Sequence, residues 1–315
     1  MGCVLVTGAA GFLGGAVLPK LLHAGHGVRA TFHRHEPRHS DGAVDWRRVD
    51  LAGAGELPGD LLRGVDTVIH LAARVHVSGP LRHWPGPFHS MNAEATRRLA
   101  LRAQDSGVRR FIFLSTVGVH GNESSVQQGT PVPMRSSDPL RPITAYARSK
   151  LAGEQALTRI CAQGAMELVT LRAPLVFGPG NGGNFLRLLK LIEYGLPLPA
   201  GSRAAPRSLV YVDNLAELLV ICLTHTGVAN QCFLLADFDL TVVALAEKLA
   251  QLLGRRLRTL RLPDWMLLGA ALHGLTRPLL LDGAPIREAC GWSPRIDADA
   301  ALTRTVAWYR TGMGS

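Results

Sequence analysis

The fold of this chain is decided by Cys3-Val-Leu-Val-Thr-Gly8-Ala-Ala-Gly11-Phe-Leu-Gly14. The first five residues, mostly apolar, predict a buried strand, and apolar residues recur at helical spacing from Val17 to Leu22. Glycines at 8, 11 and 14 would let the backbone approach a pyrophosphate, which the helix N-terminus holds by its free amides and dipole. A plain tight turn is the alternative in a chain with 34 glycines. Because a strand precedes the glycines and a helix follows, we predict the opening of a dinucleotide-binding βαβ unit.

Strands and helices alternate through the first half of the chain. Apolar runs predict further strands at Gly27–Phe32, Trp46–Asp50, Asp66–Ala72, Arg110–Thr116 and Glu167–Phe177. Helical spacing occurs between Ala93 and Ser106, and again after a proline- and serine-rich loop at 121–142. This alternation predicts an α/β fold, a Rossmann-type doubly wound parallel sheet covered on both faces.

The alternation breaks at Gly178, and the chain beyond it is interpreted as a smaller lobe interleaved with the first domain. Ser208–Val212 is expected to be a strand that returns to the sheet. An amphipathic helix is expected to start at Asp239 or Thr241 and to end at Gly254. The predicted division is a dinucleotide-binding Rossmann domain of residues 1–178 and 207–238, and a C-terminal substrate-binding lobe of residues 179–206 and 239–315.

The composition limits the class of protein. With 315 residues, 47% of them hydrophobic and 18% charged, the chain can bury a large core and is not a disordered protein. A net charge of +10 is compatible with an anionic partner, but the arginines are scattered and form no dense basic run. We therefore predict no nucleic-acid partner and attribute the charge to an arginine-rich background, which also suits a small anionic substrate.

The five cysteines are far apart and include no CxxC pair, so neither a disulfide framework nor a metal site is expected. Reduced thiols predict a cytoplasmic protein. No signal peptide is expected, because the N-terminus enters a strand-like run at once. The most apolar C-terminal stretch, Trp265–Leu272, is too short to cross a bilayer, so no transmembrane segment is expected.

A second informative stretch is Thr144-Ala-Tyr146-Ala-Arg-Ser-Lys150. On a helix, this spacing places the Tyr146 phenol and the Lys150 ammonium on one face, about one turn apart. The chain has four tyrosines and four lysines, so such a pair is improbable by chance. A free phenol has a pKa of about 10, and a nearby ammonium favours the phenolate. The pair is therefore a candidate acid/base, with an ordinary surface helix as the alternative.

The sequence leaves the nucleotide preference undecided between NAD and NADP. An acidic residue about twenty positions beyond the glycines would bind the adenosine 2′-hydroxyl and favour NAD. Here the second strand ends in Thr31-Phe-His-Arg34-His, with no carboxylate before Glu36. Arg34 is a candidate ligand of a 2′-phosphate, and a surface arginine is an equally good interpretation.

The chain resembles the extended short-chain dehydrogenase/reductases over essentially its whole length. The motifs come in the order of that family: TGAAGFLG at 7–14, DTVIHLAA at 66–73, Asn92 before a helix, FLST at 113–116, TAYARSK at 144–150 and RSLVYVDNLAELL at 207–219. The chain looks most like UDP-glucose 4-epimerase-like enzymes and the related sugar-nucleotide 4-keto reductases of bacterial polysaccharide synthesis. The resemblance implies an enzyme that uses NAD or NADP, a nucleotide-sugar substrate and a homodimer.

The resemblance also implies roles for individual residues. Tyr146 would be the general acid/base, Lys150 would bind the nicotinamide ribose, and Thr116 stands where the family has its catalytic serine or threonine. Asn184 and Arg207 match positions that hold the nucleotide diphosphate of the substrate, and the Thr116 hydroxyl would hydrogen-bond the reacting oxygen of the substrate. The implied cofactor-binding residues are Gly8, Gly11, Phe12, Leu13, Gly14, Arg34, Asp50, Leu51, Leu71, Ala72, Ala73, Asn92, Tyr146 and Lys150.

Some residues depart from the pattern of the family. Members that eliminate water from the sugar carry an acidic pair directly after the catalytic threonine, whereas this chain has Val117-Gly118, so sugar dehydration is not expected. His120 stands where a tyrosine is common. The lobe between Arg261 and Gly291 is shorter than usual, which affects the expected sugar pocket most. His70 ends a core strand and is interpreted as a packed histidine rather than a catalyst.

These observations favour an NAD(P)-dependent nucleotide-sugar 4-epimerase that acts on a UDP-hexose or UDP-N-acetylhexosamine, with hydride transfer at C4 and Tyr146 as acid/base. Two alternatives stay open. One is an NAD(P)H-dependent 4-keto reductase of a UDP-sugar, which would use the same residues. The other is a reductase of a non-sugar ketone. A non-catalytic dinucleotide sensor is disfavoured by the set of Thr116, Tyr146 and Lys150.

Overall fold

The computed structural model describes residues 2–34, 42–53, 55–75, 84–200, 205–261 and 277–312, and its centre is a seven-stranded sheet. Every neighbouring pair in the order β12-β8-β5-β4-β1-β2-β3 is parallel, and the order reverses between β1 and β4. This confirms the predicted Rossmann-type doubly wound fold. The strands of this sheet are β1 (Cys3–Thr7), β2 (Gly27–Phe32), β3 (Val44–Arg48), β4 (Val65–His70), β5 (Arg110–Thr116), β8 (Glu167–Ala173) and β12 (Gln231–Leu234).

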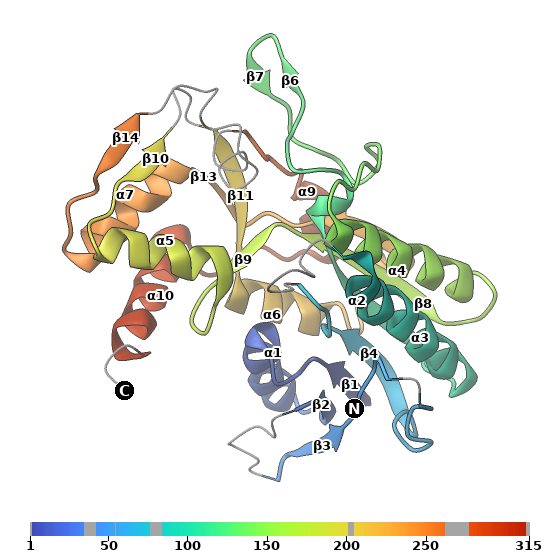
Figure 1. The fold of residues 1–315 in the computed structure, drawn as a ribbon. Coiled ribbons are helices and arrows are strands. Elements are labelled where there is room, and N and C mark those ends of the chain that lie inside the picture. The colour runs from blue at the N-terminus through green and yellow to red at the C-terminus, as the bar shows by residue number, and fades with distance from the viewer. Residues whose placement is uncertain are drawn as a thin grey trace.

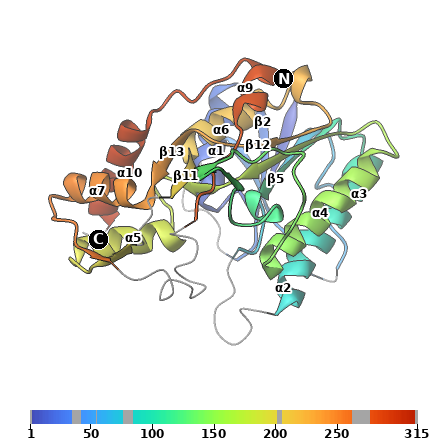
Figure 2. The same ribbon diagram turned by 90° about the horizontal axis from the view of Figure 1, so that it is seen from above.

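Helices cover both faces of the sheet, with α1 and α6 on one face and α3 and α4 on the other (Figure 1 and Figure 2). Strand β1 shows the reason: Val4 and Val6 belong to the core shared with α1 and α6, whereas Leu5 belongs to the core shared with α3 and α4. An uninterrupted apolar run is what a strand buried on both faces requires. The helices are α1 (Phe12–His23), α2 (Pro85–His89), α3 (Ala95–Asp105), α4 (Ala145–Cys161), α5 (Gly183–Glu193), α6 (Val212–Ile221), α7 (Val242–Leu253), α9 (Ala284–Cys290) and α10 (Ala298–Gly312).

A second sheet of three strands lies beside the first and has the order β13-β11-β9. In Figure 1 it stands between the large sheet and the helices α5 and α7. Two shorter pairs join β10 to β14 and, within the loop that precedes α4, β6 to β7. These strands are β6 (Val126–Gln127), β7 (Thr130–Pro131), β9 (Leu175–Phe177), β10 (Leu198–Ala200), β11 (Pro206–Tyr211), β13 (Phe238–Thr241) and β14 (Thr259–Arg261).

The prediction that Ser208–Val212 returns to the large sheet is wrong. That segment is β11, which pairs with β9 and β13, and β12 completes the large sheet instead. The single strand predicted at Glu167–Phe177 is two strands, β8 and β9, which belong to different sheets and are separated by Pro174. Proline has no backbone N–H to continue the ladder, so the chain leaves one sheet there and enters the other.

Two predicted boundaries are confirmed at α7. The Thr241 hydroxyl accepts a hydrogen bond from the Ala244 amide at 3.0 Å and so caps the start of the helix. Gly254 ends it in the left-handed conformation, at φ 67°. Among the described residues, no helix is long and apolar enough to cross a membrane. Trp265–Leu272 and residues 262–276 of the segment between Arg261 and Gly291 lie outside the described residues.

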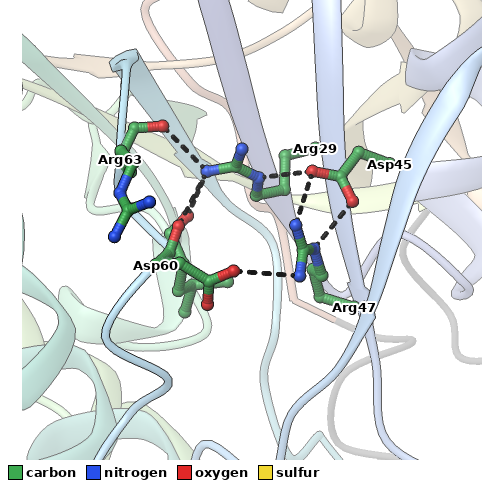
Figure 3. Close-up of polar contacts among 6 residues, drawn as sticks. Arg29, Asp45, Arg47, Asp60 and Arg63 are labelled. Atoms are coloured by element: carbon green, nitrogen blue, oxygen red, sulfur yellow. Dashed lines mark hydrogen bonds and ion pairs between the residues drawn. The ribbon is translucent and has the colours of Figure 1, made fainter.

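The edge strand β3 is held by an ion-pair cluster (Figure 3). Asp45 accepts hydrogen bonds from Arg29 Nε on β2 and from Arg47 Nε, each at 2.7 Å, and Arg47 Nη1 lies 3.1 Å from a carboxylate oxygen of Asp60. Arg29 also donates to the backbone oxygen of Arg63 at 3.0 Å. Charged side chains protect an exposed edge from further strand pairing, and here they also fix the strand that leads to Asp50.

Helix α4 packs very closely on a π-helical segment, Ser90–Glu94, that leads into α3. A Cβ atom added to Gly153 would lie 2.5 Å from the backbone oxygen of Asn92, so only glycine allows this approach. The start of α4 is capped by the Thr144 hydroxyl, which accepts from the Ala147 amide at 3.0 Å. Tyr146 and Lys150 thus sit on a helix that is fixed at its start and along its length.

Candidate active site

A cavity of about 740 Å³ opens at the carboxyl ends of the parallel strands, where ligands bind in open α/β sheets. Its walls come from the glycine loop, from the ends of β2 and β3, and from the segment after β4. The structure brings together in this cavity most of the predicted cofactor-binding residues, namely Gly8, Gly11, Phe12, Leu13, Gly14, Arg34, Asp50, Leu51, Leu71, Ala72 and Ala73. Further wall residues, which no motif in the sequence indicated, include His33, Arg74, Val75, Met91, Leu114 and Val176.

The glycine loop fits a dinucleotide. Gly8 has φ +70°, and a Cβ atom there would lie 2.7 Å from the Ala72 amide nitrogen. Gly14 lies in the first turn of α1, and a Cβ atom on it would lie 2.2 Å from the backbone oxygen of Ala9. Side chains at these positions would push the loop away from the sheet. Without them, the N-terminus of α1 faces the cavity, where a pyrophosphate would be held.

The end of the cavity at β2 and β3 carries both signs of charge. Asp50 Oδ1 accepts hydrogen bonds from the amides of Ala52 and Gly53, each at 3.1 Å, and Asp50 Oδ2 lies 3.6 Å from His33 Nε2. Arg34 is exposed on the wall. Glu36, the first carboxylate after this strand in the sequence, lies outside the described residues.

Tyr146 and Lys150 lie on the inner face of α4, and burial moves the pKa of both. Tyr146 packs against Phe88 in an edge-on arrangement, with ring centroids 6.4 Å apart, and burial raises its pKa to about 12. Lys150 is buried with Nζ 3.9 Å from the centre of the Phe113 ring. Burial lowers the pKa of Lys150 to about 7, and the Glu154 carboxylate opposes this shift. Burial thus favours the neutral form of each group.

Thr116 ends β5 and lies beside the first turn of α4. Its hydroxyl accepts a hydrogen bond from the Gly118 amide at 3.1 Å. A Cβ atom on Gly118 would lie 3.4 Å from Thr116 Oγ1 and 3.5 Å from Ala147 Cβ, so the threonine and the helix meet at this glycine. The hydroxyl therefore lies next to the helical turn that carries Tyr146.

Asn92 is fully buried and serves as an anchor between segments. Its side-chain oxygen accepts from the Arg74 amide at 2.8 Å, and its side-chain nitrogen donates to the Arg74 carbonyl at 3.0 Å. The same nitrogen donates to Ser149 Oγ on α4 at 2.9 Å. Asn92 thus holds the segment after β4, which lines the cavity, against the helix that carries Tyr146 and Lys150.

The two residues predicted to hold the diphosphate of the substrate lie on the side of the second sheet. Arg207 is on β11, donates to the Arg277 carbonyl at 2.9 Å, and has its pKa lowered by burial. Asn184 is exposed in the first turn of α5. Neither is among the wall residues of the cavity described above.

A second buried charged group, not foreseen from the sequence, adjoins the site. Glu154, one turn beyond Lys150 on α4, pairs with Arg172 on β8 at 2.7 Å. Arg172 also donates to His120 Nε2 at 2.7 Å and to the Ser136 carbonyl at 3.1 Å. The pair ties β8, the segment after Thr116 and the long loop to α4. The only signal in the sequence was the placement of Glu154 on the same helical face as Tyr146 and Lys150.

Comparison with known proteins gives matches along the chain. Residues 4–236 match the model of a family described as the NAD dependent epimerase/dehydratase family. A UDP-glucose 4-epimerase of Vibrio cholerae is 33% identical over 305 residues, which are 92% of this chain and 90% of that protein.

Solved structures agree with the observed fold. The structure of MoeE5 in complex with UDP-glucose and NAD has a TM-score of 0.82 and 26% identity, over 99% of this chain and 100% of that one. DesIV, a dTDP-glucose 4,6-dehydratase of Streptomyces venezuelae with NAD and TYD bound, has a TM-score of 0.81 and 25% identity, over 99% of this chain and 98% of that one.

Proposed function

The chain belongs to the NAD-dependent epimerase/dehydratase family, and we propose that it is an NAD(P)-dependent 4-epimerase of a UDP-sugar, a UDP-hexose or UDP-N-acetylhexosamine. The observation that carries the proposal is the placement of Tyr146 and Lys150 on the inner face of α4, with Thr116 at the end of β5 beside the first turn of that helix. The glycine loop shaped for a dinucleotide lines the cavity described above, and these three residues are not among the wall residues of that cavity. The 33% identity with a UDP-glucose 4-epimerase supports the choice of substrate class.

Each residue has a role that its chemistry permits. A bound nicotinamide dinucleotide would accept a hydride from C4 of the sugar and return it. Tyr146 would take the proton of the C4 hydroxyl as the C4 carbonyl forms. After the 4-keto sugar has turned over, the carbonyl would receive hydride on its other face, and Tyr146 would return the proton to the C4 oxygen. Thr116 would hydrogen-bond the C4 oxygen, and Lys150 would hold the nicotinamide ribose. Because burial raises the pKa of Tyr146 to about 12, the phenol needs a cationic neighbour to act as a base near neutral pH.

Two parts of the chain are proposed to bind the dinucleotide and the substrate separately. We propose that residues 1–178 and 207–238, which contain every strand of the large sheet together with β9 and most of β11, serve the dinucleotide. Residues 179–206 and 239–315 would serve the substrate. Asn184 from this part and Arg207 from the first would hold the diphosphate of the substrate. A guanidinium can bind a phosphate through two hydrogen bonds, which suits Arg207 at the border of the two parts. A homodimer is part of the same proposal.

Dehydration of the sugar is not part of the proposal. In place of an acidic pair after Thr116, the chain has Val117, which is buried, and Gly118. Neither side chain can take the C5 proton or protonate a leaving hydroxyl. The chain therefore lacks, directly after Thr116, the acidic pair that dehydration of the sugar would require.

The test is a panel of UDP-hexoses and UDP-N-acetylhexosamines, incubated with the protein and analysed for epimers. Conversion without added cofactor supports the 4-epimerase. Consumption of added NADPH with a 4-keto sugar identifies the one-way reductase, in which Tyr146 donates a proton to the C4 oxygen. If no nucleotide sugar is converted under either condition, the proposal fails. An Arg207→Ala variant that still reduces a non-sugar ketone with unchanged KM would then point to the non-sugar reductase.

A further inference from the structure

A continuous chain of buried hydrogen bonds runs beneath the cavity from the dinucleotide groove to helix α4. It begins at the Ala72 amide, which donates to Thr7 Oγ1 at 3.3 Å, and Thr7 Oγ1 lies 2.6 Å from His70 Nδ1. His70 Nε2 lies 2.9 Å from Thr96 Oγ1, which donates to the Asn92 carbonyl at 3.0 Å.

The chain continues from the Asn92 side chain into α4. The Asn92 amide donates to Ser149 Oγ at 2.9 Å, and Ser149 Oγ donates to the backbone oxygen of Tyr146 at 2.7 Å. The side chains of the whole network belong to residues no more than 4% exposed, so water does not compete for these bonds. These residues are Thr7, His70, Asn92, Thr96 and Ser149.

The two ends of the histidine segment fix the direction of the bond at His70 Nε2 and allow a donated bond at Nδ1. The Ala72 amide can only donate, so the Thr7 hydroxyl is free to donate its own proton to His70 Nδ1. The Asn92 carbonyl can only accept, so the Thr96 hydroxyl donates to it and must accept from His70 Nε2. This places a proton on His70 Nε2. The neutral Nε2–H tautomer, with Nδ1 accepting from the Thr7 hydroxyl, satisfies both neighbours of the ring.

The aromatic packing around His70 agrees with a neutral ring. One face of the Phe113 ring stacks on His70, with centroids 5.8 Å apart and an interplanar angle of 17°, and Lys150 Nζ lies over the same ring at 3.9 Å. Burial, together with the Lys150 cation, lowers the pKa of His70 to about 3. His70 and Lys150 thus both contact the Phe113 ring, and His70 carries no charge there.

We propose that His70 is a positioning residue, which as the neutral Nε2–H tautomer sets the dinucleotide groove at Ala72 in register with the turn of α4 that carries Tyr146. The expected effect of His70 on catalysis rests on the proposed function. Its tautomer and its effect on cofactor binding rest on geometry alone. A rigid link of this kind has an effect on rate because hydride and proton transfer require reacting atoms at closely defined separations.

The chain offers a matched pair of variants to test this. Thr96 and Thr305 are both fully buried helical threonines whose hydroxyls donate to the carbonyl four residues earlier, Asn92 and Ala301 respectively. Only Thr96 also receives a bond from His70. Replacement of each by valine keeps the shape and removes the hydroxyl. Thr96→Val also leaves the His70 Nε2–H without its acceptor, and urea unfolding of both variants measures this additional cost to the fold.

We expect Thr96→Val to lower kcat about tenfold and His70→Phe roughly 100-fold, with the KM of the nucleotide sugar nearly unchanged. Thr305→Val should keep the kcat of the wild type. Both site variants should also weaken NADPH and NADH binding, measured by fluorescence without any sugar. Equal kcat and equal cofactor affinity for Thr96→Val and Thr305→Val would overturn the proposal.

The tautomer has its own readout, which does not depend on the identity of the substrate. In ¹⁵N spectra of the wild-type protein labelled in histidine, one ring should show the Nε2–H pattern without titrating from pH 5 to pH 9, and His70→Phe should remove that signal. A protonated or Nδ1–H ring would overturn the assignment. If the wild type converts no nucleotide sugar but keeps this signal and the cofactor effect, the proposed function fails while the positioning role of His70 stands.

Discussion

Helix α4 carries two buried charged sites one turn apart, and they are built in opposite ways. Glu154 is paired with Arg172 at 2.7 Å, and the guanidinium has further acceptors in His120 and in a backbone carbonyl. Lys150 lies over the Phe113 ring, and within the parts of the chain that the structure describes no carboxylate forms an ion pair with it. Burial lowers its pKa to about 7.

The difference separates a charge that serves the fold from a charge that serves a ligand. A buried ion pair with all of its hydrogen bonds recovers much of its desolvation cost within the protein. A buried ammonium without a carboxylate partner does not, and such groups are typical of functional sites. The end of α4 near Tyr146 and Lys150 is therefore the active end in our interpretation, and the next turn anchors it.

The largest effect is expected at the active end, from Tyr146→Phe. Removal of the phenol oxygen should lower turnover of the UDP-sugar about 10³-fold, the range of general acid–base catalysis. Cofactor binding, followed by fluorescence, should be retained, because the ring still packs against Phe88. Tyr194→Phe is the control, since Tyr194 is 65% exposed at the end of α5. Unchanged turnover in Tyr146→Phe would disprove the acid/base role.

Next in size is the loss of stability when the anchoring pair is broken. Glu154→Gln leaves the Arg172 guanidinium buried without its countercharge, and we expect a loss of about 3–5 kcal/mol in the free energy of unfolding, measured in urea. Glu154→Leu combined with Arg172→Met should recover most of this loss. Asp299→Asn, which removes an exposed partner of Lys248, should cost far less. Equal costs for Glu154→Gln and Asp299→Asn would erase the contrast between the two turns of α4.

Lys150→Met is expected to raise the free energy of unfolding, by less than Glu154→Gln lowers it. The folded-state pKa of about 7 lies below the ordinary value of 10.5, so between these pH values the unfolded chain binds the proton that the folded chain has released. Wild-type stability should therefore rise with pH across this window. Lys150→Met removes the cost of burying the ammonium and should raise the free energy of unfolding at pH 7 by roughly 2 kcal/mol, while turnover falls.

The measurement for Lys150→Met is urea unfolding at pH 7 and at pH 9.5. The gain over the wild type should shrink at the higher pH. Lys190→Met, at an exposed position of α5, should show no such change. A Lys150→Met variant that is less stable than the wild type at pH 7 would mean that the ammonium has a stabilising partner after all.

The smallest effect is expected from an exposed cation, Arg34. Replacement by alanine should weaken NADPH binding about fivefold relative to NADH if the guanidinium meets a 2′-phosphate, since exposed ion pairs contribute little. The ratio of the two dissociation constants, measured by fluorescence, isolates the phosphate. Arg102→Ala, on the exposed side of α3, is the control. An unchanged ratio in Arg34→Ala would leave Arg34 as an ordinary surface arginine.

The sequence was sufficient wherever the determining pattern is local. The apolar run of β1, the glycines and the helix after them lie within about twenty residues, and this unit folds as expected. The cap of α7 at Thr241 and its end at Gly254 are also local. The cavity gathers most of the residues expected to bind a dinucleotide, because in a parallel sheet the ends of the strands meet at one edge.

Long-range pairing was beyond sequence reasoning. β11 could have extended either sheet, and the choice depends on β9, which follows Pro174 and belongs to the second sheet. The partners of His70 on β1 and α3 lie 63 and 26 residues away in the chain, and no spacing rule connects them. The raised pKa of Tyr146 is caused by burial, which is also set by residues distant in the sequence. The expected lowering of this pKa by the Lys150 ammonium stays a prediction.

The single residue between β8 and β9 has a consequence for recombining parts of this protein with parts of its relatives. Because Pro174 alone separates a strand of the large sheet from a strand of the small one, a crossover placed after residue 178 would graft β11 and β13 from one parent beside β9 from the other. A chimera intended to change the sugar that is accepted should therefore exchange β9, β11 and β13 as one block, with its first junction at Pro174.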